Sequence, residues 1–406
     1  MLLASSAYRR LWAARTVSQC GDVAQFTALA LLVFHLTGSG LGVSGVVIAE
    51  IIPVLVLAPL AGPLVDRMPR VTVMIAADLV RMVLAAVLAV WHGDIALVYA
   101  VAFGLSAGAV FFNPAAGSLL PALVNDDELV AANSGIWSAA VLSQVLVAPL
   151  AGLVTATAGY GWAFAANAAS FAISAALLRG LSSSEARRPV TTVSIWAQDR
   201  EALALVVRDR LLRALAVAQT LAALSAGATS ALLVVLAARR LHTSGGGYGL
   251  LLAGIAVGAF TGPLLLARLA ARIRRPTAVF TAYGLRGVVD VALATITALP
   301  AALAALVCYG IGTSTGNIAF ATVIQSHVPD RLRGRVFSAF DLSWQSMRLA
   351  SLLLGALVAD SAGIRAVYYL GGVLLAAAAI AGLTLLGPPA NRQPDRARSS
   401  PASNDR

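Results

Sequence analysis

The sequence predicts an all-α membrane protein in which twelve transmembrane helices form two similar six-helix bundles. Three observations predict this fold. The chain is 59% hydrophobic and only 12% charged, with a mean hydropathy of +0.85, whereas a soluble domain spends about a quarter of its residues on charge. Its apolar residues form runs long enough to cross a bilayer as helices. The second half of the chain also repeats features of the first.

Each apolar run is compared with the length of about 20 residues that a helix needs to span the hydrocarbon core. Glycine and proline interrupt many of the runs, which membrane helices tolerate when neighbouring helices satisfy the freed backbone groups. Small-residue stretches at 38–42 and 245–249 allow helices to approach closely. The twelve predicted spans are residues 11–36, 41–65, 71–91, 95–120, 133–158, 160–180, 211–238, 247–272, 276–297, 300–326, 335–360 and 364–386.

The arginines predict the orientation of these spans. The chain has no lysine, and most arginines lie in short clusters between the apolar runs. If the N-terminus is cytoplasmic, all the arginines outside the spans lie on the cytoplasmic side except Arg239, Arg240 and Arg365. The positive-inside rule therefore predicts a multi-pass protein of the cell (inner) membrane with both termini in the cytoplasm.

Two segments differ in composition from the spans. Residues 181–210 form the long interior connection, and the part that reads SIWAQDREALALVVRDR predicts an amphipathic helix on the inner membrane face. The tail is rich in proline, arginine, serine and aspartate, which predicts disorder. The expected domains are a bundle at 1–180, a linker at 181–210, a second bundle at 211–386 and a tail at 387–406.

The two halves of the chain repeat one another at a nearly constant offset. A shift of 205 residues places Arg81 over Arg286, and a shift of 204 places Asn113 over Asn317. Parallel repeats around a site at the middle of the membrane are an architecture of secondary transporters. The repeat therefore favours two six-helix halves joined by the 181–210 linker.

Composition and motifs argue against several other classes of protein. The net charge of +11 is spread between the apolar runs rather than over one basic face, which argues against a nucleic-acid partner. Cys20 and Cys308 lie inside apolar runs and imply buried thiols, not a disulfide framework. The first apolar run is too long for the core of a signal peptide. We find no P-loop, metal-ligand spacing or nucleophile elbow, and we expect no cofactor, no metal and no enzymatic activity.

Four stretches resemble signatures of one transporter family, the major facilitator superfamily. Residues 62–70, GPLVDRMPR, resemble its loop signature between helices 2 and 3. Two further stretches resemble the connections between helices 4 and 5 and between helices 10 and 11 in its macrolide-efflux and enterobactin-exporter-like drug/proton antiporters; they are FFNPAAGSLLPALV with DDELVAANS at 111–134, and QSHVPDRLRGRVFS at 325–338. Residues 143–152, SQVLVAPLAG, resemble a helix 5 motif of exporters. The resemblance covers the whole chain and implies alternating-access transport.

The chain departs from these signatures at several positions. Pro69 and Val71 replace the glycine and the last basic residue of the loop signature, and Ala148 and Leu153 replace glycines of the exporter motif. In the second-half copy of the loop signature, Ala271 stands where the carboxylate would be. The resemblance to the superfamily is specific, but none of these stretches names a substrate.

The loop signature implies a gate at the inner end of helix 2. By the resemblance, Asp66 pairs with groups across the two halves when the inner gate is shut, and Gly62, Arg67 and Arg70 complete this latch. The alternative is that Arg67 and Arg70 serve only to set the orientation of the neighbouring spans in the membrane. A lone acid among basic residues adds nothing to topology, so we favour the latch.

Asp22 and Glu50 are the leading candidates for proton coupling. A charge inside a span costs of order 3 kcal/mol on insertion scales, so each one needs a reason. Neither acid has an oppositely charged neighbour three or four residues away, and neither has an acidic counterpart in the other half. Desolvation disfavours the charged form of such a carboxylate, which can then bind and release a proton near neutral pH. The alternative is a structural hydrogen bond to a neighbouring helix.

Two other pairs of charges are interpreted as structural. Asp78 and Arg81 are three residues apart in helix 3, and Arg286 and Asp290 are four residues apart in helix 9. Residues at these spacings can pair within one helix, which lowers the cost of burying both charges. The resemblance implies that helices 3 and 9 lie outside the cavity.

Polar and aromatic residues of other spans predict a large amphipathic cavity. In helix 11, Ser338, Asp341, Gln345 and Arg348 follow a spacing of 3, 4 and 3 that aligns them on one face. A polar face within a membrane must look into protein or water. Arg348 can balance Asp341 or hold an anionic substrate. The cavity candidates are Phe26, Asn113, Trp137, Gln144, Gln219, Asn317, Asp341, Gln345 and Arg348.

The sequence thus predicts a monomeric secondary transporter that exports drug-like or natural-product molecules, most of them apolar or weakly cationic, in exchange for protons. Two alternatives remain open. One is a dedicated exporter of a siderophore or another metabolite, and the other is a degenerate facilitator that acts as a membrane sensor. The direction of transport rests on the resemblance.

Overall fold

The computed structural model describes residues 5–125, 128–181, 195–267 and 276–386. Within these ranges the chain is helical and contains no strand. Twelve of the described helices are long and apolar enough to cross a membrane, which confirms the predicted all-α membrane fold. The helices are α1 (Ser6–Thr37), α2 (Gly40–Arg67), α3 (Arg70–Val90), α4 (Ile95–Leu123), α5 (Leu129–Thr157), α6 (Tyr160–Leu178), α7 (Ile195–Arg208), α8 (Arg210–Ala231), α9 (Leu233–Arg239), α10 (Gly245–Ala267), α12 (Thr277–Thr295), α13 (Leu299–His327), α14 (Asp330–Ser361) and α15 (Ile364–Leu386).

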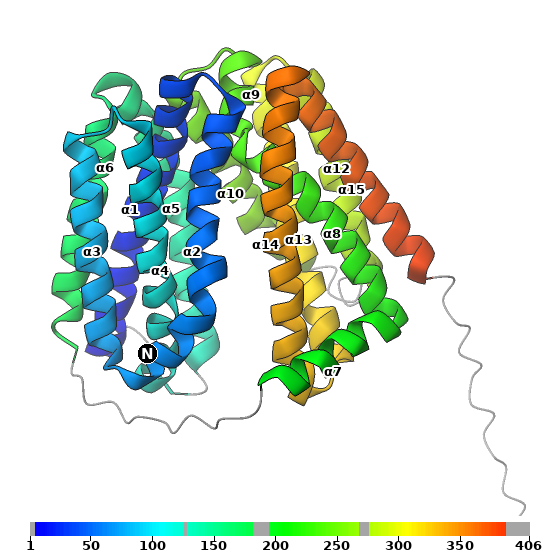
Figure 1. The fold of residues 1–406 in the computed structure, drawn as a ribbon, viewed down its shortest axis with the longest axis horizontal. Coiled ribbons are helices and arrows are strands. Elements are labelled where there is room, and N and C mark those ends of the chain that lie inside the picture. The colour runs from blue at the N-terminus through cyan, green and yellow to red at the C-terminus, as the bar shows by residue number, and fades with distance from the viewer. Residues whose placement is uncertain (1–4, 126–127, 182–194, 268–275, 387–406) are drawn as a thin grey trace, which may run out of the picture.

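The spanning helices fall into two bundles that stand side by side (Figure 1). In the first bundle, α1 packs against α5 and α6, and α3 packs against α4 and α6. In the second bundle, α12 packs against α13 and α15, and α14 packs against α8. Contacts of α5 with α10 and of α2 with α14 form the interface between the bundles. The centre of the molecule is therefore lined by helices from both halves of the chain.

The helix α7 lies across one end of the second bundle, where it packs against α14 and α8 (Figure 1). It occupies the stretch for which the sequence predicts an amphipathic helix. The remaining linker residues 182–194, the predicted disordered tail at 387–406 and the arginine cluster at 268–275 lie outside the described residues. We name the two ends of the molecule by their elements: the α1–α2 end, which carries the turn between these helices, and the α7 end.

Side-chain caps and glycines fix several of the helix ends. Ser39 caps α2, because its hydroxyl accepts hydrogen bonds from the amides of Leu41 and Gly42. Asp94 caps α4 in the same way through the amide of Ala96. The turn between α1 and α2 contains Gly38, whose φ of 62° lies in the left-handed region that glycine adopts without strain.

Small residues bring α5 and α10 into direct backbone contact at the bundle interface. A Cβ atom at Gly152 would clash with the backbone of Gly245, and a Cβ atom at Gly249 would clash with the backbone of Ala148. Small residues allow this approach, which gains packing energy that bulkier side chains would prevent. The predicted small-residue stretch at 245–249 therefore allows the close contact between the two bundles.

One predicted span is wrong in detail. The sequence predicts a single helix at 211–238, but the structure divides it into α8 and α9 at Leu232. The hydroxyl of Ser351, on α14, accepts a hydrogen bond from the amide of Ala228 at 2.9 Å and donates to the carbonyl of Leu224 at 2.5 Å. A regular helix joins this amide and carbonyl directly, so the side chain interrupts the hydrogen-bond ladder within α8, four residues before the division at Leu232. The apolar pattern of one segment cannot reveal a side chain that arrives from another helix.

Candidate functional site

The strongest concentration of charge in the first bundle surrounds Arg81 on α3. Its guanidinium forms an ion pair with Asp78 and lies between the rings of Phe112 and Phe171, at 4.7 and 4.3 Å from their centroids. Asp78 is fully buried and also accepts a hydrogen bond from the hydroxyl of Ser174 on α6, at 2.6 Å. Arg81 and Asp78 are thus held rigidly inside the bundle.

Asp22 approaches the same guanidinium from α1. Its carboxylate lies 3.8 Å from Nη1 of Arg81, and its side chain is 45% exposed. Two carboxylates therefore share one guanidinium, and Asp22 is the more weakly held and the more accessible of the two. The sequence suggests no charged partner for Asp22, because it reveals only neighbours on the same helix. The partner comes from α3 through tertiary packing, so the predicted pair of Asp78 and Arg81 is not self-contained.

Glu50 faces a charge of the opposite sign across the bundle interface. It lies on α2, within electrostatic reach of Arg348 on α14 and of Asp22 on α1. Its backbone carbonyl accepts a hydrogen bond from the hydroxyl of Ser106 at 2.5 Å, which ties α2 to α4 at this level. Tyr248, on α10, lies within reach of the same carboxylate. The two predicted proton-coupling acids therefore share one electrostatic environment at the centre of the molecule.

The corresponding charges of the second bundle do not form the predicted ion pair. Arg286 donates a hydrogen bond to the hydroxyl of Tyr309 at 2.8 Å, and its guanidinium lies 4.8 Å from the centroid of that ring. Asp290 instead accepts a hydrogen bond at 3.4 Å from the hydroxyl of Ser225 on α8. Arg286 and Asp290 each form a hydrogen bond to a residue of a neighbouring helix, and they do not form an ion pair with each other within α12.

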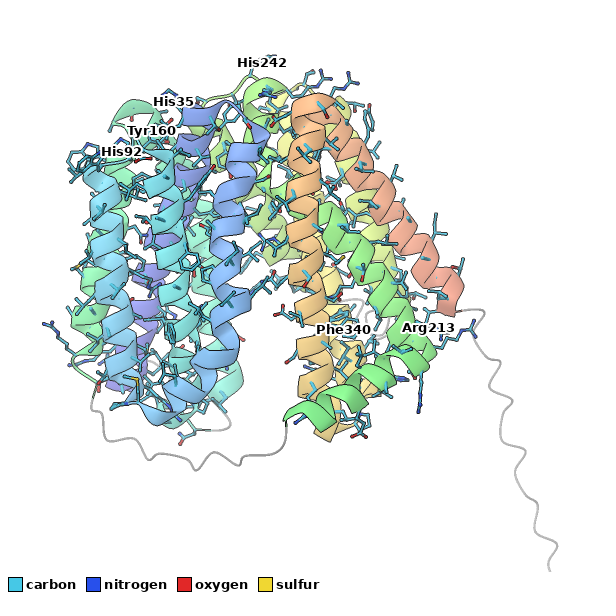
Figure 2. The ribbon with its side chains drawn as sticks, in the orientation of Figure 1. His35, His92, Tyr160, Arg213, His242 and Phe340 are labelled. Carbon is cyan, nitrogen blue, oxygen red and sulfur yellow. The ribbon has the colours of Figure 1, made fainter. Side chains whose placement is uncertain are left out.

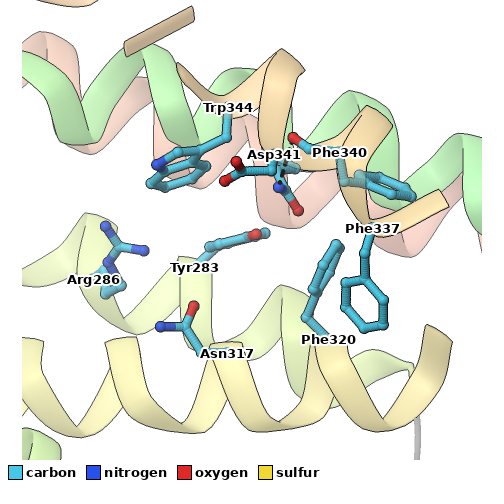
Figure 3. Close-up of a pocket in the computed structure, with 9 residues that line it drawn as sticks. Tyr283, Arg286, Asn317, Phe320, Phe337, Phe340, Asp341 and Trp344 are labelled. Atoms are coloured by element: carbon cyan, nitrogen blue, oxygen red, sulfur yellow. Dashed lines mark hydrogen bonds between the residues drawn. The ribbon is translucent and has the colours of Figure 1, made fainter. Parts of the chain in front are cut away.

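A pocket of about 290 Å³ opens inside the second bundle (Figure 3). Three of the predicted cavity residues line it, namely Gln219, Asn317 and Asp341. Two others, Gln345 and Arg348, lie further along α14. Arg286 lines it as well, although the sequence assigns that residue a packing role only. The remaining lining residues are Tyr283, Phe320, Phe337, Phe340 and Trp344.

A second pocket, of about 410 Å³, lies between α1 and α5 of the first bundle. Trp137 of the predicted cavity residues lines it and stacks on Phe260 of α10, with ring centroids 6.3 Å apart and an interplanar angle of 13°. Sequence reasoning missed Arg15 and Gln19, which also line this pocket. The signal that could have identified Arg15 is a charge inside the predicted span at 11–36.

Three further cavity candidates lie apart from these two pockets. Asn113 is exposed on α4, Gln144 is half-buried on α5, and Phe26 packs against the buried core of the bundles. His35, His92 and His242 gather with Tyr160 at the α1–α2 end (Figure 2), away from the central charges.

The predicted latch is described only in part. The side chains of Gly62, Asp66 and Arg67, in the last turns of α2, lie outside the described part of the chain. Arg70, at the start of α3, donates a hydrogen bond from Nη1 to the carbonyl of Ser118 on α4, at 3.1 Å. This contact joins two helices of the same bundle, and the latch between bundles stays a prediction.

The opposite end carries a set of contacts that the sequence did not suggest. The carboxylate of Asp360, at the end of α14, accepts hydrogen bonds from the hydroxyl of Ser39 at 2.9 Å and from the amides of Gly40 at 3.0 Å and Leu41 at 3.3 Å. Arg239 donates a hydrogen bond to the carbonyl of Gly38 at 2.5 Å. We call these residues, 38–41 with Arg239 and Asp360, the α1–α2 clamp.

Helix dipoles explain the signs of the charges in the clamp. The N-terminus of a helix carries a partial positive charge and the C-terminus a partial negative charge. The second bundle presents a carboxylate to the N-terminus of α2 and a guanidinium to the C-terminus of α1. The bundles are thereby joined at the α1–α2 end, and in Figure 1 their ribbons approach there and diverge toward α7.

Comparison with known proteins identifies the family. A family model described as the Major Facilitator Superfamily matches residues 11–347 and, in a second match, residues 215–404. The chain belongs to the major facilitator superfamily. It is therefore a multi-pass membrane transporter of this superfamily, and the matching relatives and structures are transporters rather than enzymes.

Two curated relatives of this facilitator cover nearly its whole length. The uncharacterised MFS-type transporter YfiS of Bacillus subtilis (strain 168) is 25% identical over 394 residues, which are 93% of this chain and 92% of that protein. The multidrug efflux pump Tap of Mycolicibacterium fortuitum is 29% identical over 376 residues, which are 88% of this chain and 90% of that protein.

Solved structures agree in fold. The nucleoside transporter NupG superposes with a TM-score of 0.75 at 14% identity, over 94% of this chain and 100% of that one. A bacterial homologue of the iron transporter ferroportin, in its inward-facing state, gives a TM-score of 0.75 at 17% identity, over 96% of this chain and 100% of that one. At such identities the likeness concerns the fold alone.

Proposed function

We propose that this facilitator exports drug-like or natural-product molecules from the cytoplasm in exchange for protons, with Asp22 as the principal proton carrier. The observation that carries the proposal is the shared guanidinium of Arg81. The cluster contains two carboxylates and one guanidinium, so one negative charge remains, and it resides on the accessible Asp22. A carboxylate in this position can be neutralised by a proton or by a cationic substrate, and the two compete.

This competition is the basis of antiport. When Asp22 binds a proton, its attraction to Arg81 ends, and α1 is no longer tied electrostatically to α3. When Asp22 releases the proton toward the cytoplasm, its negative charge is restored and can attract a weakly cationic substrate. Each proton that enters down a membrane potential releases about 2.3 kcal/mol per 100 mV. This energy drives export against a concentration gradient.

Glu50 and Arg348 link the proton site to the motion of the bundles. They belong to different bundles and have opposite charges, so their attraction depends on how closely α2 and α14 approach. Asp22 lies within reach of Glu50. A proton or a substrate at Asp22 therefore changes the electrostatic energy of the interface between the halves, which is the coupling that alternating access requires.

The observed conformation fits one state of this cycle. The α1–α2 clamp joins the bundles at one end, while the pocket lined by Arg15 and Trp137 lies in the half nearer to the α7 end. We place both termini in the cytoplasm of the cell that carries the protein in its inner membrane, because the described arginines at the start of α1 and around the junction of α7 and α8 lie at the α7 end; they are Arg9, Arg10, Arg208, Arg210 and Arg213. The conformation is then closed to the outside and accessible from the cytoplasm.

The likeness to the efflux pump Tap supports export of more than one compound, since that relative is described as a multidrug pump. A single polypeptide carries both halves of the site, so we propose that a monomer is sufficient. The substrates favoured by a cavity with aromatic walls and one free carboxylate are apolar or weakly cationic molecules.

The proposal is tested by uptake of ethidium and erythromycin into proteoliposomes with an acidic lumen. We expect accumulation of at least one compound that requires the pH gradient and stops when a protonophore collapses it. Liposomes without protein provide the background rate. Transport at an unchanged rate after the gradient has collapsed would show a passive facilitator and would contradict antiport.

A further inference from the structure

The two bundles surround their central arginines with different side chains. Arg81 and Arg286 occupy equivalent positions at the offset of 205, and each packs against a glycine of the neighbouring helix. A Cβ atom at Gly108 would lie 2.7 Å from Cγ of Arg81, and a Cβ atom at Gly312 would lie 3.0 Å from Cγ of Arg286. The buried arginine is thus a repeated feature of the fold, and its partners can be compared.

The second bundle lacks both carboxylates that surround the arginine of the first. At the offset of 205, Tyr283 takes the position of Asp78, which replaces a carboxylate with a neutral phenol. At the two offsets of the repeat, Asp22 corresponds to Ala226 or Gly227. Arg286 therefore occupies the position equivalent to Arg81, but no carboxylates stand at the positions equivalent to Asp22 and Asp78.

Arg286 consequently has hydrogen-bonding capacity to spare. It is only 5% exposed, it donates to the hydroxyl of Tyr309, and its Nε has no hydrogen-bond partner. A guanidinium carries five N–H donors, and a buried charge without a full set of partners is costly. Asp290 offsets part of the charge from the next turn of α12, but it forms no ion pair with Arg286 and bonds to Ser225 on α8.

The 290 Å³ pocket gives a ligand access to this guanidinium (Figure 3). Figure 3 shows Arg286 and Asn317 toward one end of the pocket and three phenylalanine rings at the other, with the carboxylate of Asp341 between them. Among the described residues, the amide of Asn317 and the carboxylate of Asp341 form no hydrogen bond or ion pair, and the phenol of Tyr283 lies within electrostatic reach of Arg286. Phe320 makes edge-to-face contacts with Phe337 and Phe340, with centroids 6.4 and 5.1 Å apart.

We propose that this pocket binds a small aromatic zwitterion. Its anionic group contacts Arg286 and Asn317, its basic group contacts Asp341, and its ring lies among Phe320, Phe337 and Phe340. Both charges line one pocket, so a ligand that carries both signs satisfies the pocket fully, whereas a simple cation or anion leaves one charge unmatched. The volume is at the low end of the range for small-molecule sites, which is roughly 300–1,000 Å³. The site is separate from the Asp22 cluster, and its occupation does not depend on proton coupling.

The test uses three forms of one aromatic compound and the full-length protein in detergent. Naphthylalanine is the zwitterion, its methyl ester is the cation, and its N-acetyl derivative is the anion. Binding is measured by isothermal titration calorimetry. We expect the zwitterion to bind about tenfold more tightly than either derivative, which is the effect of one charge-assisted hydrogen bond.

Variants assign the charges of the ligand to residues of the pocket. Asp341→Asn is expected to weaken binding of the zwitterion by about tenfold and to leave binding of the N-acetyl anion nearly unchanged. Asn317→Ala is expected to weaken binding of both. Asp94→Asn is the matched control, because it makes the same carboxylate-to-amide change at a distant helix cap, and asparagine caps helices as well as aspartate does. Size-exclusion chromatography verifies that each variant is folded.

Three results would overturn the proposal: equal affinity for all three forms, an affinity for the zwitterion that Asp341→Asn leaves unchanged, or no binding of any form to the wild type. Loss of proton-coupled transport with zwitterion binding intact would contradict the proposed function alone. The two failures are therefore distinguishable.

Discussion

Asp22 and Asp78 compete for one guanidinium, and the competition is unequal. Asp78 has an ion pair with Arg81, a hydrogen bond from Ser174 and no solvent exposure, whereas Asp22 has only a contact at 3.8 Å and an accessible side chain. Ion pairs between accessible groups are weak, and buried hydrogen-bonded pairs are hard to separate. The residue that can change its charge during a transport cycle is therefore Asp22.

Sequence reasoning identified Asp22 and Glu50 because a charge inside an apolar span requires an explanation. It could not identify their partners, since Arg81 and Arg348 reach them from other helices. For the same reason it assigned Arg286 to an ion pair within α12 that the structure does not contain. Spacing along one helix describes possible contacts, and tertiary packing decides which of them form.

The opposite charges of Glu50 and Arg348 predict a thermodynamic coupling between the two residues. We expect Glu50→Gln and Arg348→Gln to lower the transport rate by about tenfold or more each, because each leaves a half-buried charge without its opposite at the interface. The double variant is expected to recover part of the loss, since it removes both charges together. Initial rates of uptake into proteoliposomes measure the effect. Fully additive losses would contradict the coupling.

At the scale of secondary structure, one hydroxyl of α14 interrupts the hydrogen-bond ladder of α8 between Leu224 and Ala228. Ser351→Ala is expected to let the amide of Ala228 bond directly to the carbonyl of Leu224, which regularises α8 at this level and slows transport severalfold. Ser361→Ala is a suitable control, because that hydroxyl bonds only to Leu357 of its own helix. Transport rates at equal protein density give the comparison. Equal rates for both variants would show that the inserted hydroxyl has no part in transport.

The start of α8 provides a prediction with a defined pH dependence. Burial alone would raise the pKa of Asp209, but hydrogen bonds from His327 and from the amide of Leu212 outweigh it and hold the pKa below its usual value. The carboxylate therefore stabilises the fold above the pKa of an unfolded aspartate, about 3.9, and this contribution is lost as the pH falls through the folded pKa.

We expect Asp209→Ala to destabilise the protein by about 1 kcal/mol at neutral pH, the usual effect of removing a helix cap. The difference from the wild type is expected to shrink as the pH is lowered below about 4. Thermal unfolding in detergent at a series of pH values measures both effects. A difference that stays constant with pH would contradict an ionised cap.

The lengths and order of the helices were largely predictable, because each span needs about 20 apolar residues and this requirement is local. The confirmed spans between α1 and α6 illustrate it. The exceptions are tertiary in origin. Ser351 of α14 inserts into the hydrogen-bond ladder of the span predicted at 211–238, and the clamp forms where Asp360 meets the N-terminus of α2, about 320 residues away in the chain.

At the scale of the whole molecule, alternating access requires the α1–α2 end to open during each transport cycle. A Cβ atom at Gly40 would lie 3.1 Å from Cβ of Ala359, close to the spacing of a disulfide. In a protein whose Cys20 and Cys308 are replaced by serine, cysteines at these two positions are expected to cross-link on oxidation. Transport should then stop and return when the disulfide is reduced.

The outcome of the cross-link distinguishes a moving gate from a fixed contact. The same protein with only the Gly40→Cys change is the control, and its transport should not respond to oxidation. A cross-linked double variant that transports at the full rate would show that this end stays closed throughout the cycle, and alternating access between the two ends would have to be abandoned.

The half-repeat and the hydropathy together predicted a two-bundle molecule, and the family match covers both halves. They also indicate that the halves differ in their acidic residues, but they could not predict which side chains the packing brings to each arginine. The first bundle surrounds its arginine with carboxylates, and the second replaces them with a phenol and an open pocket. Such differences arise from single substitutions that leave the apolar pattern unchanged.

Substrate-induced proton release shows whether Asp22 carries the exchanged proton. Proteoliposomes with an acidic lumen and an internal pH dye receive ethidium, and alkalinisation of the lumen is recorded for the wild type, Asp22→Asn and the control Asp94→Asn. We predict release for the wild type and the control and none for Asp22→Asn, with ethidium then moving only down its own gradient. Undiminished proton release from Asp22→Asn would contradict the account.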